Sequence, residues 1–149
     1  MKTIPLIFVL FLIFTVSPST EAQIPSPSVT EEEVRQFMDQ YRERFMKMDL
    51  DAYMALFLKD AVENRALPYA DIREAYQRTI ARSRSIVYQL KIHAVQTYAR
   101  SAFVSGRYRI IQVFKKDGRE KVYKGNIQYD LVRENSSLKI REINYGRDD

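Results

Sequence analysis

The C-terminal part of the chain alternates between apolar and polar residues with a period of two. Two such runs lie between Lys121 and Tyr145, and the polar tetrapeptide Glu134–Ser137 separates them. In the first run, one face carries Tyr123, Ile127, Tyr129 and Leu131, and the other carries Lys124, Asn126, Gln128 and Asp130. Alternate side chains of a strand point to opposite faces of a sheet. The pattern therefore predicts a half-buried β-hairpin whose apolar face another part of the chain must cover.

The same alternation begins earlier, after Ser85. Ile86, Tyr88, Leu90 and Ile92 alternate with Gln89, Lys91 and His93, and a second β-rich run extends over 102–114. The turn Lys115–Gly118 joins that run to the last hairpin, and its Asp-Gly pair favours a tight turn. We therefore expect a meander of about four long strands.

Upstream of residue 85 the apolar residues recur at helical spacing. Val34, Phe37, Met38, Tyr41, Phe45 and Met48 form one stripe. Thr30, followed three residues later by Glu33, matches a capping box at the start of this helix. A shorter helix should follow, capped around Asp49–Asp51, with Leu50, Met54 and Phe57 facing inward.

A short strand or loop is expected around 61–64, and Pro68 fits the first turn of a third helix. In that helix Tyr69, Ile72, Tyr76 and Ile80 share a face. Helices followed by a strand meander predict an α+β fold with the helices on one face of the sheet.

The N-terminus has the composition of a secretory signal peptide. Lys2 precedes an apolar run over 4–16, and small residues follow before the expected cleavage after Ala22. A membrane span needs roughly 20 apolar residues, so an uncleaved anchor is the less favoured alternative. We expect a signal peptide over 1–22, a linker over 23–29, one domain over 30–146 and a tail over 147–149. The mature protein would then be periplasmic or secreted, with no stable membrane span.

The composition of the chain argues against several kinds of functional site. The net charge is +5, with acidic residues interspersed among the basic ones, which favours a solvated surface over a nucleic-acid site. The chain has no Cys, so disulfides and thiol nucleophiles are excluded. It has a single His, His93, and no H-E-x-x-H motif, so we expect no metal site and no cofactor.

Three segments resemble a known family: Lys47–Phe57 (KMDLDAYMALF), Lys59–Asn64 (KDAVEN) and the closing Gly125–Tyr145. They are similar to the NTF2-like superfamily, and in particular to its SnoaL-like and DUF4440-type bacterial members. The resemblance covers roughly residues 30–146. It implies a cone, in which a curved antiparallel sheet wraps around the helices and leaves a pocket at the wide end. It also implies that the protein can dimerise through the sheet.

The superfamily includes ketosteroid isomerases, whose chemistry needs a carboxylate base, a tyrosine and a neutral carboxylic acid. By resemblance, the tyrosine position falls on Tyr41, and the base position falls on Asn64 or, with a one-residue slip, on Glu63. The second acid falls near Ile127 or Gln128, and neither is an acid. An isomerase or lyase using Tyr41 and Glu63 therefore stays the alternative hypothesis.

The leading hypothesis is an exported, non-catalytic binding or protein-interaction domain, and a role in the cell envelope is conceivable by analogy. Its pocket would take a small apolar or amphipathic ligand. The partners considered are that ligand, a second copy on the sheet face and a cell-wall protein. A purely structural homodimer is a third reading. The residues expected to bind the ligand are Tyr41, Phe45, Asn64, Tyr76 and Tyr129.

Several other residues have an ordinary explanation beside a functional one. Tyr69, Tyr76, Tyr108 and Tyr129 could wall a pocket, although ordinary sheet and helix packing is the commoner explanation. Arg107 and Arg109 alternate with Tyr108 and could grip an anion, whereas exposed strand arginines are common.

Overall fold

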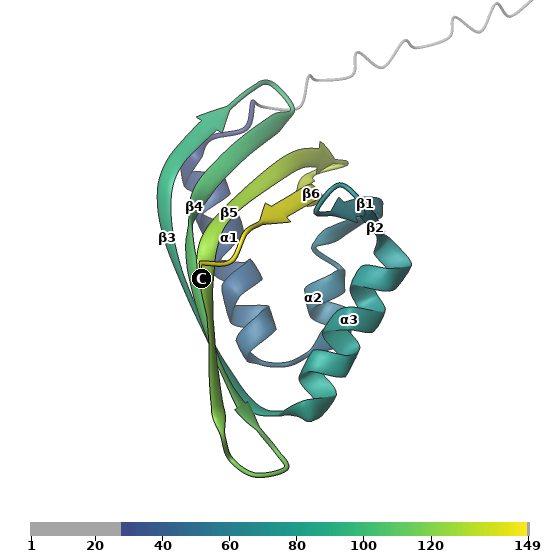
Figure 1. The fold of residues 1–149 in the computed structure, drawn as a ribbon. Helices are drawn as coiled ribbons and strands as arrows, with labels where there is room; N and C mark the ends of the chain where they lie inside the picture. Colours follow the sequence, from purple (N-terminus) through teal and green to yellow (C-terminus); the bar gives the residue numbers. More distant parts are fainter. Residues whose placement is uncertain (1–27, 149) are drawn as a thin grey trace, which may run out of the picture.

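The computed structural model describes residues 28–148 (Figure 1). The expected signal peptide and most of the expected linker lie outside the described residues. The elements are α1 (Glu31–Met46), α2 (Leu50–Met54), β1 (Phe57–Glu63), β2 (Leu67–Pro68), α3 (Tyr69–Arg82), β3 (Ser83–Thr97), β4 (Ser101–Phe114), β5 (Glu120–Glu134) and β6 (Ser137–Tyr145). None of the helices within this range has the length and apolar content needed to span a membrane.

The strands form one six-stranded sheet in the order β2-β1-β6-β5-β4-β3. It curves around the helices, which all lie on its inner side (Figure 1). The predicted α+β cone is therefore confirmed. The sheet is mixed, because β1 runs parallel to β6 while every other pair is antiparallel. A parallel pair needs a long connection, and here β2, α3 and β3–β5 together provide it.

The start of α1 follows the predicted cap only in part. The side-chain oxygen of Thr30 accepts a hydrogen bond from the Glu33 amide at 3.2 Å. Val29, the last residue of the expected linker, is buried together with Val34, as in a hydrophobic staple. The Glu33 carboxylate, however, accepts two hydrogen bonds from Arg133 of β5, at 2.8 and 2.7 Å. Glu33 thus ties α1 to the sheet.

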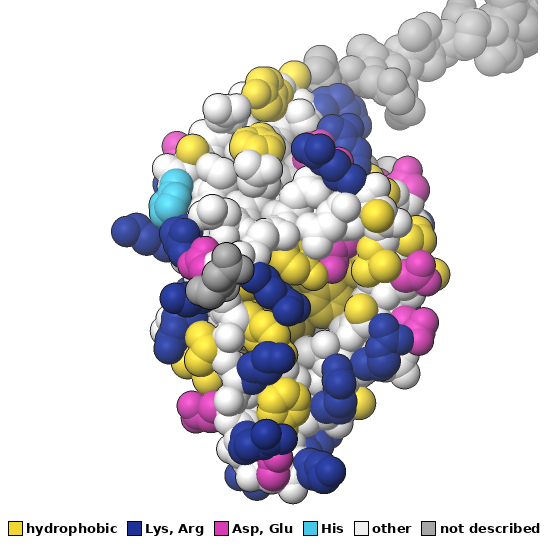
Figure 2. Space-filling model, viewed as in Figure 1, with side chains coloured by type: hydrophobic (Ala, Val, Ile, Leu, Met, Phe, Trp, Pro, Cys, Tyr) yellow, Lys and Arg dark blue, Asp and Glu magenta, His cyan; other side chains and the backbone are white. Residues whose placement is uncertain are grey.

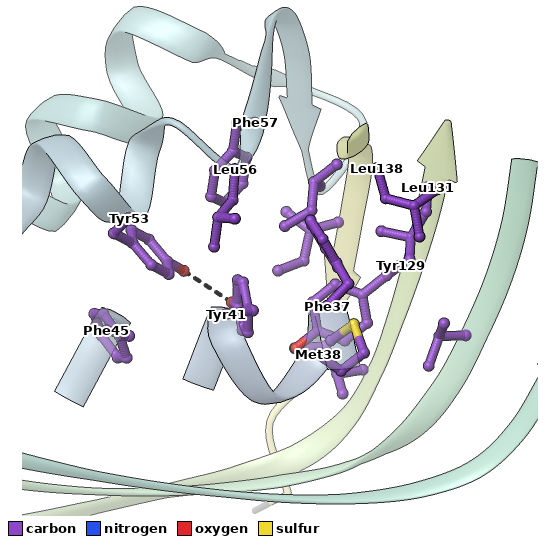
Figure 3. Packing of buried hydrophobic residues seen from close by; sticks show 14 of the residues in the cluster. Phe37, Met38, Tyr41, Phe45, Tyr53, Leu56, Phe57, Tyr129, Leu131 and Leu138 are labelled. Atoms are coloured by element: carbon purple, nitrogen blue, oxygen red, sulfur yellow. Dashed lines mark hydrogen bonds between the residues drawn. The ribbon is translucent and has the colours of Figure 1, made fainter. Parts of the chain in front are cut away.

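The core is unusually rich in tyrosine. Tyr41, Tyr53, Tyr88 and Tyr129 are all at most 3% exposed, so each hydroxyl group needs a partner inside the protein. The hydroxyl of Tyr53 donates to that of Tyr41 at 2.8 Å (Figure 3), and the hydroxyls of Tyr88 and Tyr129 lie 2.8 Å apart. Each of these four buried hydroxyl groups therefore has another tyrosine hydroxyl as its partner.

Two boundaries differ from the sequence prediction. The second helix ends at Met54, so Phe57 opens β1 instead of lying on that helix. Pro68 is the N-cap of α3 and not part of its first turn. Of α3 only Ile72 is fully buried, and Tyr76 and Thr79 are half-buried. This incomplete burial of α3 leaves a hollow between the helix and the sheet.

Candidate functional site

A pocket of about 230 Å³ lies between α3 and the inner face of the sheet. Figure 2 shows apolar side chains deep in a hollow, with Lys and Arg side chains around its rim. The pocket is lined by Phe45, Tyr76, Thr79, Arg82, Tyr108, Ile110, Gln112, Tyr123, Tyr145 and Arg147.

The walls of the pocket are aromatic. The rings of Phe45 and Tyr76 meet edge to face with centroids 5.5 Å apart. On the other side, Tyr108 and Tyr145 meet in the same way at 6.0 Å. Strand alternation places Tyr108, Ile110 and Gln112 on the same face of β4, and helical spacing places Tyr76 beside Thr79. Local periodicity therefore brings these side chains to a common surface.

Hydrogen bonds link three polar side chains at this wall, those of Tyr123, Gln112 and Ser83. Gln112 is 3% exposed, and its amide nitrogen donates to the Ser83 hydroxyl at 2.8 Å. Its amide oxygen accepts from the Tyr123 hydroxyl at 3.3 Å. Gln112 thereby fixes the hydroxyl end of Tyr123, an arrangement that suits a preformed pocket.

The mouth of the pocket is basic. Arg82 is the last residue of α3, and Arg147 follows β6. The guanidinium of Arg147 lies 5.0 Å from the centre of the Tyr123 ring, close enough for a cation–π contact. Both arginines are exposed, and neither forms an ion pair with a carboxylate of the described residues.

Glu63 lies next to the pocket, behind two of its tyrosines. It is 5% exposed. Its carboxylate accepts hydrogen bonds from the hydroxyls of Tyr145, at 2.5 Å, and Tyr76, at 3.3 Å. Burial raises the pKa of Glu63 above its usual 4.5, and the two tyrosine hydrogen bonds only partly oppose that rise. Burial and the bond to Glu63 likewise raise the pKa of Tyr145.

Known structures resemble this one. A candidate aromatic ring hydroxylase from Novosphingobium aromaticivorans superposes with a TM-score of 0.68 at 20% identity, over 78% of this chain and 87% of that chain. An NTF2-like superfamily protein from Salmonella enterica gives 0.68 at 16%, over 79% and 90%. The chain has the NTF2-like fold. A candidate scytalone dehydratase from N. aromaticivorans has the same shape, with a TM-score of 0.68 at 14% identity over 79% and 83%.

Comparison of the sequence with known families and proteins gives no further relative. No family model matches the chain, and no curated protein matches it. At identities of 20% or less, the structural similarity establishes the NTF2-like fold, whereas function depends on the site itself.

Within this NTF2-like fold, the expected ligand-binding residues divide into three groups. Phe45 and Tyr76 line the pocket. Tyr41 and Tyr129 are buried in the core and do not line it. Asn64 is exposed, and its side-chain oxygen accepts a hydrogen bond from the Tyr145 amide at 2.8 Å. It therefore holds the backbone of a pocket residue.

Arg82, Gln112, Tyr145 and Arg147 were not among the site residues predicted from the sequence. Gln112 could have been recognised from the sequence, because it is a polar residue at an inward position of an otherwise apolar strand face. Arg147 belongs to the expected tail, yet the backbone there pairs with β5: the Gly146 amide donates to Asn126, and the Asp148 amide donates to Lys124. No local pattern marks Arg82 and Arg147 as neighbours of one pocket.

The described residues contain no group of three or more His, Cys, Asp or Glu side chains placed to hold a metal. His93 and Arg109 are exposed, and Arg107 is paired with Asp148. The chemistry available at the pocket is therefore that of its tyrosines, its arginines and the carboxyl group of Glu63.

The raised pKa of Glu63 predicts a definite pH dependence of stability. The native carboxyl binds its proton more strongly than the unfolded one, so the contribution of Glu63 should become more favourable as the pH falls from neutral toward 4.5. We expect wild type to gain stability relative to Glu63→Gln over this range, measured by urea unfolding at successive pH values. Glu142→Gln controls for the removal of a carboxyl group. A loss of relative stability on acidification would show that the native site prefers the charged form.

Proposed function

We propose that this protein is an exported, non-catalytic binding domain whose pocket holds a small apolar or amphipathic molecule. The observation that carries the proposal is the composition of the pocket. Its walls are aromatic and aliphatic, and only a few polar groups converge on it, as is usual for ligand sites. Export rests on the N-terminal sequence, with its basic start and apolar run.

Binding fits the arrangement better than the tyrosine-based isomerase mechanism. That mechanism needs Tyr41 to face the ligand, whereas Tyr41 is 2% exposed and absent from the lining of the pocket. Its hydroxyl is already engaged by Tyr53. Tyr41 thus acts as a core residue in this arrangement.

Native mass spectrometry tests the proposal. The protein should be expressed with its own N-terminal sequence and recovered from the periplasm. We expect a mass that begins at Gln23, with additional mass that is lost on denaturation. A doubled mass would also support the homodimer that the family resemblance implies. Retention of residues 1–22 would contradict cleavage.

A matched pair of variants locates the ligand. Ile110 lines the pocket, and its neighbour Ile111 lies on the opposite face of β4, where it pairs with Val87 and Val122. Ile110→Trp should fill the pocket and abolish the bound mass, whereas Ile111→Trp should retain it. Equal retention in both variants would place the ligand elsewhere and contradict a binding function for this pocket.

A second candidate function is proton transfer by Glu63, in an isomerase or lyase. The observation that favours it is the buried Glu63 carboxylate, held by two tyrosines that line the pocket. A raised pKa suits a general base. The candidate dehydratase and hydroxylase among the structural neighbours make enzymatic roles worth testing.

Deuterium exchange separates this candidate from simple binding. Under the enzymatic hypothesis, wild type should accelerate exchange of the α-protons of 4-phenylbutan-2-one in D₂O. Glu63→Gln should abolish the acceleration, and Glu142→Gln should retain it. If Glu63→Gln exchanges these protons as fast as wild type, Glu63 is not the base.

A further inference from the structure

We propose that the pocket selects ligands that carry an anionic group next to an apolar body, and that Arg82 and Arg147 contact this anion at the mouth. The inference rests on the proposed binding function and specifies its ligand class. Three features of the described residues support it: the charges at the mouth, the fixed position of Arg147 and the size of the pocket.

The charges at the mouth have one sign. Among the described residues that line the pocket there is no Asp or Glu, whereas Arg82 and Arg147 are both present. Arg82 uses its Nε to donate to the Arg78 carbonyl oxygen at 3.2 Å, which leaves its two terminal nitrogens free of bonds to described residues. A third cation, the ammonium group of Lys121, lies 5.0 Å from the centre of the Tyr123 ring. The mouth is therefore complementary to an anion.

The neighbouring acids are engaged elsewhere. Asp148 follows Arg147 directly, but its carboxylate pairs with Arg107. The carboxyl group of Glu63 is held by Tyr76 and Tyr145 and is not among the lining groups. The arginines at the mouth thus have no carboxylate partner among the described residues, and an anionic ligand would supply one.

The position of Arg147 is fixed by the backbone around it. The Gly146 amide donates to the Asn126 carbonyl oxygen at 3.1 Å, and the Asp148 amide donates to that of Lys124 at 2.9 Å. Gly125, which lies between these two acceptors on β5, has no side chain, and a Cβ there would lie 1.9 Å from the Gly146 carbonyl oxygen. Glycine at this position therefore allows the close approach that carries Arg147 to the mouth.

The apolar body must be small. The volume of about 230 Å³ lies below the roughly 300–1,000 Å³ of pockets for drug-sized ligands. Phe45, Tyr76, Tyr108 and Ile110 surround this space. A single ring or a short alkyl chain, with its charged end toward the two arginines, matches both the volume and the charge pattern.

The test uses two probes that differ only in charge, 4-phenylbutyrate and 4-phenylbutyramide. Binding is followed by NMR titration of the full mature chain, with the Ile110 methyl groups reporting on the pocket. We expect the carboxylate to bind about tenfold more tightly than the amide, because hydrogen bonds to a charged group are the stronger ones. The preference should shrink as the salt concentration rises.

Three variants identify the groups responsible. Arg82→Gln and Arg147→Gln should each reduce the preference for the carboxylate severalfold, because each should weaken binding of the carboxylate more than binding of the amide. Arg109→Gln removes the same charge from an exposed site outside this pocket and should preserve the preference.

The outcomes that contradict the inference are distinct from those that contradict the proposed function. Equal binding of both probes at Ile110 would overturn anion selection but retain pocket binding. A carboxylate preference lost equally in Arg109→Gln would indicate nonspecific attraction and also overturn the inference. No response of Ile110 to either probe at millimolar concentration would contradict the binding function itself.

Discussion

Replacing Glu33 with alanine is expected to lower the free energy of unfolding by about 3 to 5 kcal/mol, as is typical when one partner of a buried ion pair is removed. The Arg133 side chain is only 5% exposed. Its Nη1 and Nη2 donate to the two Glu33 oxygens, and its Nε is buried without a hydrogen-bond partner among the described residues. Without Glu33, the guanidinium charge would be buried with little compensation. Urea unfolding measures the loss.

The two side chains of the Glu33–Arg133 ion pair differ in exposure, and this difference provides a control for the prediction. The Glu33 side chain is 33% exposed, so water can solvate its carboxylate when Arg133 is absent. Arg133→Met should therefore cost clearly less than Glu33→Ala. Glu32→Ala changes the same helix turn at an exposed site and should cost within about 0.5 kcal/mol. Equal costs for Glu33→Ala and Glu32→Ala would show that the ion pair contributes nothing.

Replacing Phe57 with alanine is expected to cost about 3 to 5 kcal/mol, as for other buried Phe-to-Ala substitutions. Phe57 is 3% exposed at the start of β1. Its ring centroid lies 5.4 Å from that of Tyr53 and 6.4 Å from those of Tyr41 and Tyr76. The substitution would leave a cavity among these rings. Thermal or urea unfolding would measure the loss.

Two further variants separate cavity formation from other effects. Phe57→Leu retains most of the buried volume and should recover much of the stability. Phe103→Ala removes the same atoms from a half-buried site on β4 and should cost less. Comparable losses in Phe57→Ala and Phe103→Ala would contradict a central role for the aromatic cluster. Because Tyr76 belongs to both the cluster and the pocket wall, Phe57→Ala should also weaken probe binding.

The sequence determined those features that depend on residues close together in the chain. The helical stripe of 31–46 and its Thr30 cap, the strand alternation after residue 85 and the Asp117-Gly118 turn all follow from local periodicity and backbone preference. Gly118 has φ +68°, a conformation that glycine adopts without strain. These elements, taken in order, were enough to predict an α+β fold, and the resemblance to the NTF2-like superfamily implied the cone.

Only the tertiary structure decided the relations between distant elements. Glu33 matches a capping box in sequence, yet its carboxylate binds Arg133, 100 positions away, because the curvature of the sheet brings β5 to the start of α1. Tyr41 lies on the inward stripe, and local spacing could not tell whether that stripe meets a pocket or other side chains. It meets Tyr53.

The candidate site likewise combines residues that the sequence could predict with residues that only the tertiary structure brings together. Phe45 and Tyr76 could be predicted as site residues from the sequence, because they lie on apolar helix faces. Arg82 and Arg147 come from the end of α3 and from the segment after β6, and their side chains look like ordinary surface charges in the sequence. Pairing of residues 146–148 with β5 brings Arg147 to the mouth of the pocket. Sequence periodicity fixes which face of an element is apolar, whereas the strand register and sheet curvature fix what that face meets.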